Sequence, residues 1–363
     1  MRRIFIGLLF TAFATAASAA TVSTLITTPL AIEGLTYDDQ GNLYTPGRAA
    51  AGQPCPVWRI PVDNPSLTIV GTVPAPSSST ACSPSGLAIG PDGRVYVTQN
   101  DSIYRFTPNA SSPPTAELWA TGVPGTNGLA FDQRGALWTG DGTTGLGRVW
   151  KITPDGKPTE MFRIPAMVNP VNVGRDVRSV PTGNSQPLVA NGVMVTRRGN
   201  LIVADTARGA LWAVYLDSNG NVLSPTGCDT TYPSNTLCWD NVLVQHPLME
   251  GADGITLDVA GGIWVDANER NAVVYVTPYY YEVLEVFRSP PDATTQLRNK
   301  GPLETPTSPV VVGHKFCTAN SDGNRRDNSP NTAGEIGGTG QPKGKISCIN
   351  ERVTIPGLSL PVR

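Results

Sequence analysis

The sequence predicts an all-β protein, a single-domain β-propeller made of six four-stranded antiparallel blades. Glycine (38) and proline (33) together make up about a fifth of the 363 residues, and both residues break or destabilise helices. Short β-prone runs alternate with turn residues along the chain. A motif of one polar residue followed by glycine opens successive units of similar length, which is typical of repeat folds.

The first twenty residues are predicted to be a cleavable signal peptide. Arg2 and Arg3 form a basic start, residues 4–16 are mostly apolar, and Ala17-Ser18-Ala19 provides small residues of the kind that signal peptidase cuts. The apolar run is short for a bilayer core of about 30 Å, so an uncleaved anchor is the weaker alternative. We expect residues 21–363 to form the propeller of a secreted or periplasmic protein, with no membrane span after signal removal.

The opening motif defines the blades. Units begin with a polar-Gly pair at Glu33, Ser85, Asn127, Asn191 and Asp253, and a degenerate sixth unit begins near Ser308 without the glycine. In the first five units a glycine-centred turn follows eight residues after the opening, and further short β-rich runs come next. Six such units predict a radially closed ring. Two stacked sandwiches, the alternative, do not explain why the motif returns in the same register.

The ends of the chain bear on how the ring closes. Residues 22–28 alternate and are β-prone, so they are expected to form the outer strand of the last blade, with residues 352–360 competing for that place. An insertion rich in Asn, Gly, Asp and Arg occupies residues 320–344. It lies either over the channel or on the rim.

All six cysteines follow the predicted signal peptide, and their spacing favours disulfides. The expected pairs are Cys55–Cys82, Cys228–Cys238 and Cys317–Cys348, because sequence neighbours close surface loops. The last pair would join the second strand of blade six to its third. Free thiols are the alternative, whereas a zinc site is disfavoured because the chain has no CxxC motif and only two histidines.

The opening residues predict a metal site. The innermost strand of each blade runs along the central channel, so these side chains are expected to meet near one mouth of it. They include two carboxylates and two carboxamides and no cationic residue, and buried charges are costly without a partner. Ca²⁺ prefers such oxygen ligands; Mg²⁺ and Mn²⁺ accept them too, and Zn²⁺ fits less well without histidine. The alternative is that Asn-Gly and Asp-Gly pairs only form tight turns.

The sequence resembles the gluconolactonase/regucalcin-like propellers, with diisopropyl fluorophosphatase as a cousin. The motifs behind this resemblance are Glu33-Gly, Asn127-Gly-Leu, Asn191-Gly-Val with Val203-Ala204-Asp205, and Asp253-Gly-Ile with Gly262-Ile263-Trp264-Val265. The resemblance implies a divalent cation, usually calcium, held by Glu33, Asn127, Asn191 and Asp253, with Asp253 also the base or nucleophile. The export signal, the disulfides and the extended last blade depart from the cytosolic members of that family.

These expectations define a metal-dependent hydrolase that opens a lactone or related ester ring in a small-molecule substrate. The metal would polarise the carbonyl, and Asp253 would activate water or attack directly. A Gly-x-Ser-x-Gly elbow with a histidine partner is absent from the sequence. Ser85, Asp205 and His246 are further candidate substrate contacts, although Asp205 also fits an Asx turn and His246 a solvated loop.

Two other functions remain open. A non-catalytic propeller could use calcium only to rigidify the channel mouth and bind a small molecule or protein partner. A metal-free condensing propeller similar to strictosidine synthase is disfavoured, because no cation would then balance the negative charge of the oxygen ligands. The net charge of −2 gives no electrostatic case for nucleic acid, and we expect a monomer.

Overall fold

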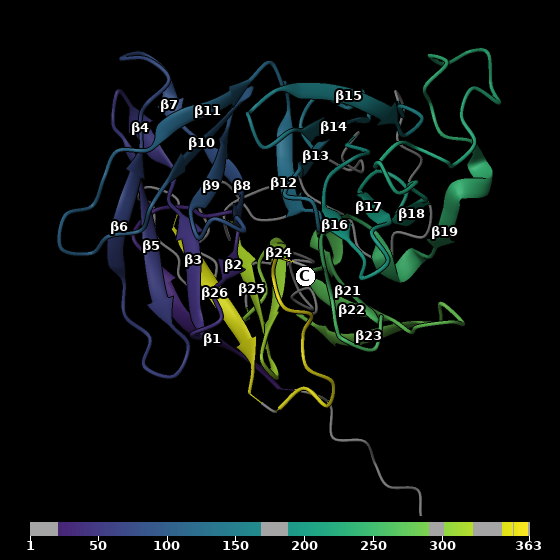
Figure 1. Ribbon diagram of the computed structural model, residues 1–363. Helices are drawn as coiled ribbons and strands as arrows, with labels where there is room; N and C mark the ends of the chain where they lie inside the picture. Colours follow the sequence, from purple (N-terminus) through teal and green to yellow (C-terminus); the bar gives the residue numbers. More distant parts are fainter. Residues whose placement is uncertain (1–20, 168–187, 290–300, 322–342, 351, 362–363) are drawn as a thin grey trace, which may run out of the picture.

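The computed structural model describes residues 21–167, 188–289, 301–321, 343–350 and 352–361. These residues form six four-stranded antiparallel sheets around a central channel (Figure 1). The predicted six-bladed β-propeller is therefore confirmed. The helices in the described ranges are three short 3₁₀ turns, and none of them is long and apolar enough to cross a membrane.

The strands follow the predicted units in chain order, with the innermost strand of each blade first. Blade one has β2 (Thr36–Tyr37), β3 (Asn42–Pro46), β5 (Cys55–Pro61) and β6 (Thr68–Val73). Blade two has β8 (Pro84–Ile89), β9 (Val95–Gln99), β10 (Ser102–Phe106) and β11 (Glu117–Thr121). Blade three has β12 (Thr126–Phe131), β13 (Leu137–Asp141), β14 (Arg148–Ile152) and β15 (Pro158–Arg163).

The second half of the ring repeats this order. Blade four has β16 (Val193–Val195), β17 (Leu201–Asp205), β18 (Ala210–Val214) and β19 (Val242–Gln245). Blade five has β20 (Ala252–Leu257), β21 (Ile263–Ala267), β22 (Ala272–Val276) and β23 (Val283–Arg288). Blade six has β24 (Pro306–Val312), β25 (Lys315–Asn320), β26 (Gly344–Ile349) and β1 (Val22–Thr28). The 3₁₀ turns are η1 (Trp239–Asn241), η2 (Pro247–Met249) and η3 (Asn268–Arg270).

The N-terminal strand closes the ring, as the sequence predicts. Strand β1 pairs antiparallel with β26, so blade six is built from both ends of the chain. The competing segment, residues 352–360, does not take that place. The three predicted disulfides are also present, and Cys317 lies opposite Cys348 in the β25–β26 pair.

The glycine of the opening motif is explained by the close approach of neighbouring blades. A Cβ built on Gly34, Gly86, Gly128, Gly192 or Gly254 would lie less than 3.0 Å from the main-chain carbonyl oxygen of the next blade's opening residue. Only a residue without a Cβ fits such a contact. The second glycine, eight residues after each opening, has a positive φ of 75° to 91° in the hairpin turn. The repeated motif thus encodes both blade packing and the first turn.

Apolar side chains fill the spaces between adjacent blades. One cluster, for example, joins blades four and five through Ala204, Leu211, Val265 and Val274. Similar clusters lie at the other five contacts between blades. The core is therefore a ring of inter-blade layers, and this ring fixes the inner strands around the channel.

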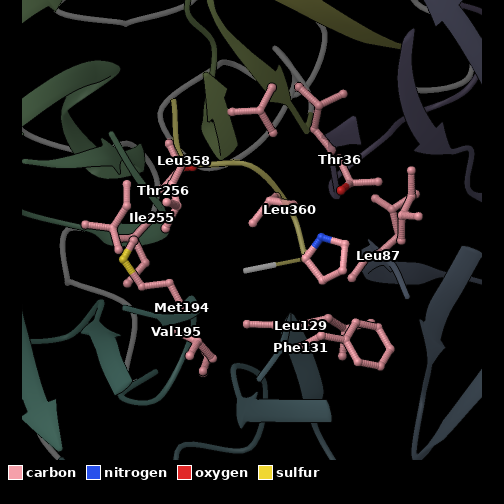
Figure 2. Close-up of a pocket in the computed structure, with 18 of the residues that line it drawn as sticks. Thr36, Leu87, Leu129, Phe131, Met194, Val195, Ile255, Thr256, Leu358 and Leu360 are labelled. Atoms are coloured by element: carbon pink, nitrogen blue, oxygen red, sulfur yellow. The ribbon is translucent and has the colours of Figure 1, made fainter. Parts of the chain in front are cut away.

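The C-terminal segment fills the end of the channel that carries the first turns. Figure 2 shows Leu358 and Leu360 among apolar side chains from the inner strands, including Leu87, Met194 and Ile255. The Leu358 main-chain N–H donates to the carbonyl of Leu257, and the Tyr37 hydroxyl donates to the carbonyl of Leu358. Burial raises the pKa of Tyr37 to about 12, which keeps this donor protonated. A cavity of about 90 Å³ remains at this apolar end of the channel.

Candidate functional site

A polar cavity of about 490 Å³ lies at the other end of the inner strands. The opening residues of the first five blades border it: Glu33, Ser85, Asn127, Asn191 and Asp253. The structure therefore brings the four predicted metal ligands together. In blade six the equivalent residue is Thr307 rather than Ser308, because the Thr307 carbonyl faces Gly254 and the Thr307 hydroxyl donates to the carbonyl of Glu33.

Irregular strand pairing directs several of these side chains toward the channel. The pairing of the first two strands shifts between Pro84 and Leu87, between Thr126 and Leu129, and between Ala252 and Ile255. Ser85, Asn127 and Asp253 lie inside these shifts. A bulge re-aims the residues it contains, which explains how successive blades present polar side chains at one height.

Glu33 is held by two nitrogen donors. The amide of Asn127 donates from Nδ2 to Glu33 Oε1 over 3.2 Å, and the Arg48 guanidinium forms an ion pair with Oε2. Both charged side chains are largely shielded, with exposed fractions of 14% for Glu33 and 16% for Arg48. The expectation that no cationic residue pairs with the carboxylates is therefore wrong for Glu33. It considered the opening residues alone, and Arg48 comes from the loop after β3.

A local ribbon places Arg48 at the cavity. Its main-chain N–H donates to the carbonyl of Ala31, two residues before Glu33. Strand β4 (Ala49–Ala51) begins directly after Arg48 and pairs with β7 (Ala81–Cys82). The Cys55–Cys82 disulfide joins this ribbon to β5. Arg48 directly precedes this ribbon, and Ser83, which also borders the cavity, directly follows it. Among the described residues, the other blades carry no such two-stranded addition.

Asn191 presents an oxygen that has no partner among the described residues. Its Nδ2 donates to the Thr206 hydroxyl over 3.1 Å, whereas its Oδ1 is buried without a hydrogen bond. Gly142 makes room for this arrangement, since a Cβ there would lie 2.7 Å from Asn191 Oδ1 and 2.7 Å from Asn127 Nδ2. A buried acceptor without a donor is costly, so this oxygen indicates a place for a cation or a donor group.

Asp253 is oriented by a neighbouring amide. Asn268, the first residue of η3, donates from Nδ2 to Asp253 Oδ2 over 2.8 Å. Asp253 is buried, and both residues border the cavity. The hydrogen bond fixes the plane of the carboxylate, as expected for a metal ligand or a general base.

The donor set fits a hard divalent cation. Two carboxylates and two carboxamides provide oxygen ligands of the kind that Ca²⁺ and Mg²⁺ take, and the bare Asn191 Oδ1 lies among them. Within the described ranges no three Asp, Glu, His or Cys side chains gather into a metal site. A cation here would therefore depend on the two asparagines for half of its side-chain ligands.

The three candidate substrate contacts do not all lie at the cavity. Ser85 borders the cavity, as predicted, but Asp205 and His246 are not among its lining residues. Asp205 is fully buried: it accepts from Arg208 and from Trp212 Nε1, which is the local turn role given above as its alternative. Burial raises the pKa of Asp205 although Arg208 opposes this shift. His246 Nδ1 accepts from the Leu248 main-chain N–H and caps η2.

Several lining residues escaped sequence reasoning. Arg48, Asn100, Thr143, Asn268 and Thr305 lie in loops after the second strand of a blade or before the first. Arg48, Asn100 and Asn268 shared one signal, because each lies fifteen residues after the opening residue of its blade, as Thr206 lies after Asn191. The predicted signal peptide and most of the insertion at 320–344 lie outside the described residues.

The described residues thus form a six-bladed propeller with a ring of oxygen-bearing side chains at one mouth of its channel. The profile of the SMP-30/gluconolactonase/LRE-like region matches residues 83–302. The chain belongs to this family. No curated protein sequence matches the chain.

Solved structures share the fold at low sequence identity. A luciferin-regenerating enzyme superposes with a TM-score of 0.58 at 15% identity, covering 94% of this chain and 98% of its own. The calcium-binding protein regucalcin of Agrobacterium tumefaciens gives 0.58 at 16% identity, covering 94% and 97%. The PQQ-bound aldose sugar dehydrogenase of Streptomyces coelicolor gives 0.57 at 18% identity, covering 91% and 99%. These likenesses support the fold.

Proposed function

We propose that this protein is an exported, divalent-metal-dependent lactonase that opens the ring of a polar lactone. The observation behind the proposal is the meeting of Glu33, Asn127, Asn191 and Asp253 at one cavity, with Asn191 Oδ1 buried and bare. Membership of a family named for gluconolactonase supports the lactonase class. A bound divalent cation would supply Lewis-acid polarisation of the lactone carbonyl. Ca²⁺ is the first choice for these ligands, ahead of Mg²⁺ and Mn²⁺.

Asp253 is the residue proposed to move the proton. Its carboxylate borders the cavity, and Asn268 holds one of its oxygens. The carboxylate would take a proton from water as that water attacks the carbonyl carbon. The protonated carboxyl would then return this proton to the ring oxygen, which leaves as an alcohol when its bond to the carbonyl carbon breaks. Asn268 keeps the carboxylate oriented toward the cavity during this transfer.

The rim of the cavity favours a hydroxylated substrate. Hydroxyl and amide side chains surround the proposed ligands, namely Ser83, Ser85, Asn100, Thr126, Thr143 and Thr305. Such groups donate to and accept from sugar hydroxyls, and an apolar lactone would leave them without partners in a desolvated site. A sugar lactone therefore suits the site better than an acyl lactone.

Export is proposed from the sequence start and from the cysteines. All six cysteines form disulfides, and structural disulfides persist mainly in oxidising compartments. Signal-peptide cleavage can be checked by N-terminal sequencing of the protein recovered from periplasm or medium.

The test of the function compares Asp253→Asn with wild type in a pH-stat assay over a panel of sugar lactones, with and without a chelator. The variant should lose about 10²- to 10⁴-fold in kcat while retaining a cation by elemental analysis. Asp155→Asn, which changes an exposed carboxylate elsewhere, should keep full activity.

Full activity of Asp253→Asn with its metal bound would refute the assigned role. Absence of turnover by metal-loaded wild type across lactones, esters and phosphotriesters would favour the non-catalytic binding propeller instead.

A further inference from the structure

We propose that Arg48 is a built-in competitor of the divalent cation: it pairs with Glu33 in the metal-free protein and must release this carboxylate before the cation binds. The inference rests on the proposed metal site. It adds a residue that the ring of opening residues does not contain, and it concerns loading of the site rather than the chemical step.

Nitrogen donors occupy both oxygens of Glu33. Oε1 accepts from Asn127, and Oε2 carries the ion pair with Arg48. A cation bound to Glu33 and Asn127 needs the oxygens of both side chains, so the Asn127 amide must turn and the guanidinium must withdraw. Metal binding at these two residues therefore replaces existing contacts.

The two sides of the cavity differ in how far their oxygen atoms are free for a cation. Asn191 already presents a bare Oδ1, and Gly142 leaves space beside it. Asp253 is already oriented by Asn268. The half of the site contributed by blades four and five is preorganised for a cation, whereas the half contributed by blades one and three is neutralised by Arg48.

Arg48 is fixed at the cavity and does not extend into solvent. Its main chain is bonded to Ala31, and the β4–β7 ribbon with the Cys55–Cys82 disulfide follows directly. A guanidinium anchored in a largely shielded position keeps its charge, because arginine does not deprotonate in proteins. It therefore disfavours a cation at Glu33 by repulsion as well as by occupying the carboxylate.

The test measures binding of Ca²⁺ to purified, EDTA-stripped protein by isothermal titration calorimetry. Arg48→Gln should bind Ca²⁺ with a Kd about 5- to 30-fold lower than wild type, which corresponds to the loss of one or two kcal/mol of competing interaction. Arg198→Gln, which changes an exposed arginine outside the cavity, should leave the Kd unchanged. Circular dichroism confirms folding, and Arg48→Lys, which keeps the charge without the planar fork, provides a second variant with an intermediate Kd.

A double variant separates direct competition from a general effect of charge. In a Glu33→Gln background, Arg48→Gln should lower the Kd by a smaller factor than in the wild-type background, because the contested carboxylate is gone and only the charge repulsion remains. Thermal melts give an independent readout. Without metal, Arg48→Gln should have a lower Tm than wild type, and saturating Ca²⁺ should make the difference between the two Tm values smaller.

Equal or weaker Ca²⁺ binding by Arg48→Gln would overturn the competition while leaving the metal site and the lactonase proposal intact. Failure of both wild type and Arg48→Gln to bind Ca²⁺, Mg²⁺ or Mn²⁺ would overturn the metal site itself. The two failures are thus distinguishable.

Discussion

Replacing Lys345 with methionine should destabilise the protein strongly, because Lys345 forms a fully buried ion pair with Glu304. The Nζ–Oε2 distance is 2.9 Å, and both side chains have an exposed fraction of 0%. Lys345 lies in β26, and its Nζ also donates to the Gly301 carbonyl over 2.6 Å. The pair therefore ties the segment leading into blade six to the blade that closes the ring.

The expected loss follows from this burial. Removing one partner of a buried pair leaves an uncompensated charge and costs about 3–5 kcal/mol. Urea unfolding at pH 7, followed by tryptophan fluorescence, measures this change in the free energy of unfolding. The double variant Lys345→Met/Glu304→Gln should recover at least half of the loss, because neither residue then carries a charge.

An exposed pair provides the control. Lys157 and Asp155 lie 2.7 Å apart with exposed fractions of 81% and 57%, and such pairs contribute about 0–1 kcal/mol. Lys157→Met should therefore change the stability by less than about 1 kcal/mol. A Lys345→Met protein within 1 kcal/mol of wild type, or a double variant less stable than the single one, would refute the assignment of a buried ion pair.

Two further predictions concern stability. Burial raises the pKa of Asp266 well above its ordinary value. The protonated carboxyl therefore contributes to the free energy of unfolding in full below about pH 4, and this contribution is lost as the pH rises toward the native pKa. Asp266→Asn should thus raise the Tm at pH 7 and make the Tm less dependent on pH between pH 4 and 8. If the Tm of the variant depends on pH as steeply as that of wild type, burial of the Asp266 carboxylate is not the cause of that dependence. Replacing Cys317 and Cys348 by alanine opens a link across 31 residues and should cost about 3–4 kcal/mol by chain entropy. Loss of the Cys228–Cys238 link across 10 residues should cost about 1 kcal/mol less, and urea unfolding that gives the reverse order would exclude chain entropy as the main cause.

The sequence predicted the features that the repeat encodes. The polar-Gly motif gave the blade openings, because the glycine is required wherever one inner strand meets the carbonyl of the next blade. The same register brought Glu33, Asn127, Asn191 and Asp253 to one cavity. Ring closure by β1 was also predictable, since an alternating β-prone segment was left over at the N-terminus.

The features that the repeat does not encode could not be predicted in this way. In blade six the missing glycine left the register open by one residue, and a shift in pairing between Pro306 and Ser308 placed Thr307 at the opening. Arg48 lies fifteen residues after Glu33, and its main-chain bond to Ala31 recurs between Gly142 and Gly125 and between Asn268 and Gly251. The β4–β7 ribbon that follows Arg48 has no counterpart among the described residues of the other blades. The period therefore marks the position of Arg48, but the residue type at that position differs from blade to blade, so the period does not predict a cationic side chain there.

The two ends of the channel differ in the side chains that line them. In each blade a polar side chain lies at the cavity just before the inner strand or near its start, and apolar side chains follow toward the end filled by Leu358 and Leu360. The repeated positions thus supply the proposed ligands and the base, and they are fixed by the packing of the whole ring. Arg48 also stands at a repeated position, fifteen residues after Glu33, but it directly precedes the β4–β7 ribbon that the Cys55–Cys82 disulfide joins to β5, and Ser83 directly follows this ribbon. We therefore expect changes in this ribbon to alter the proposed competition of Arg48 with the cation while the inner strands keep their places in the ring.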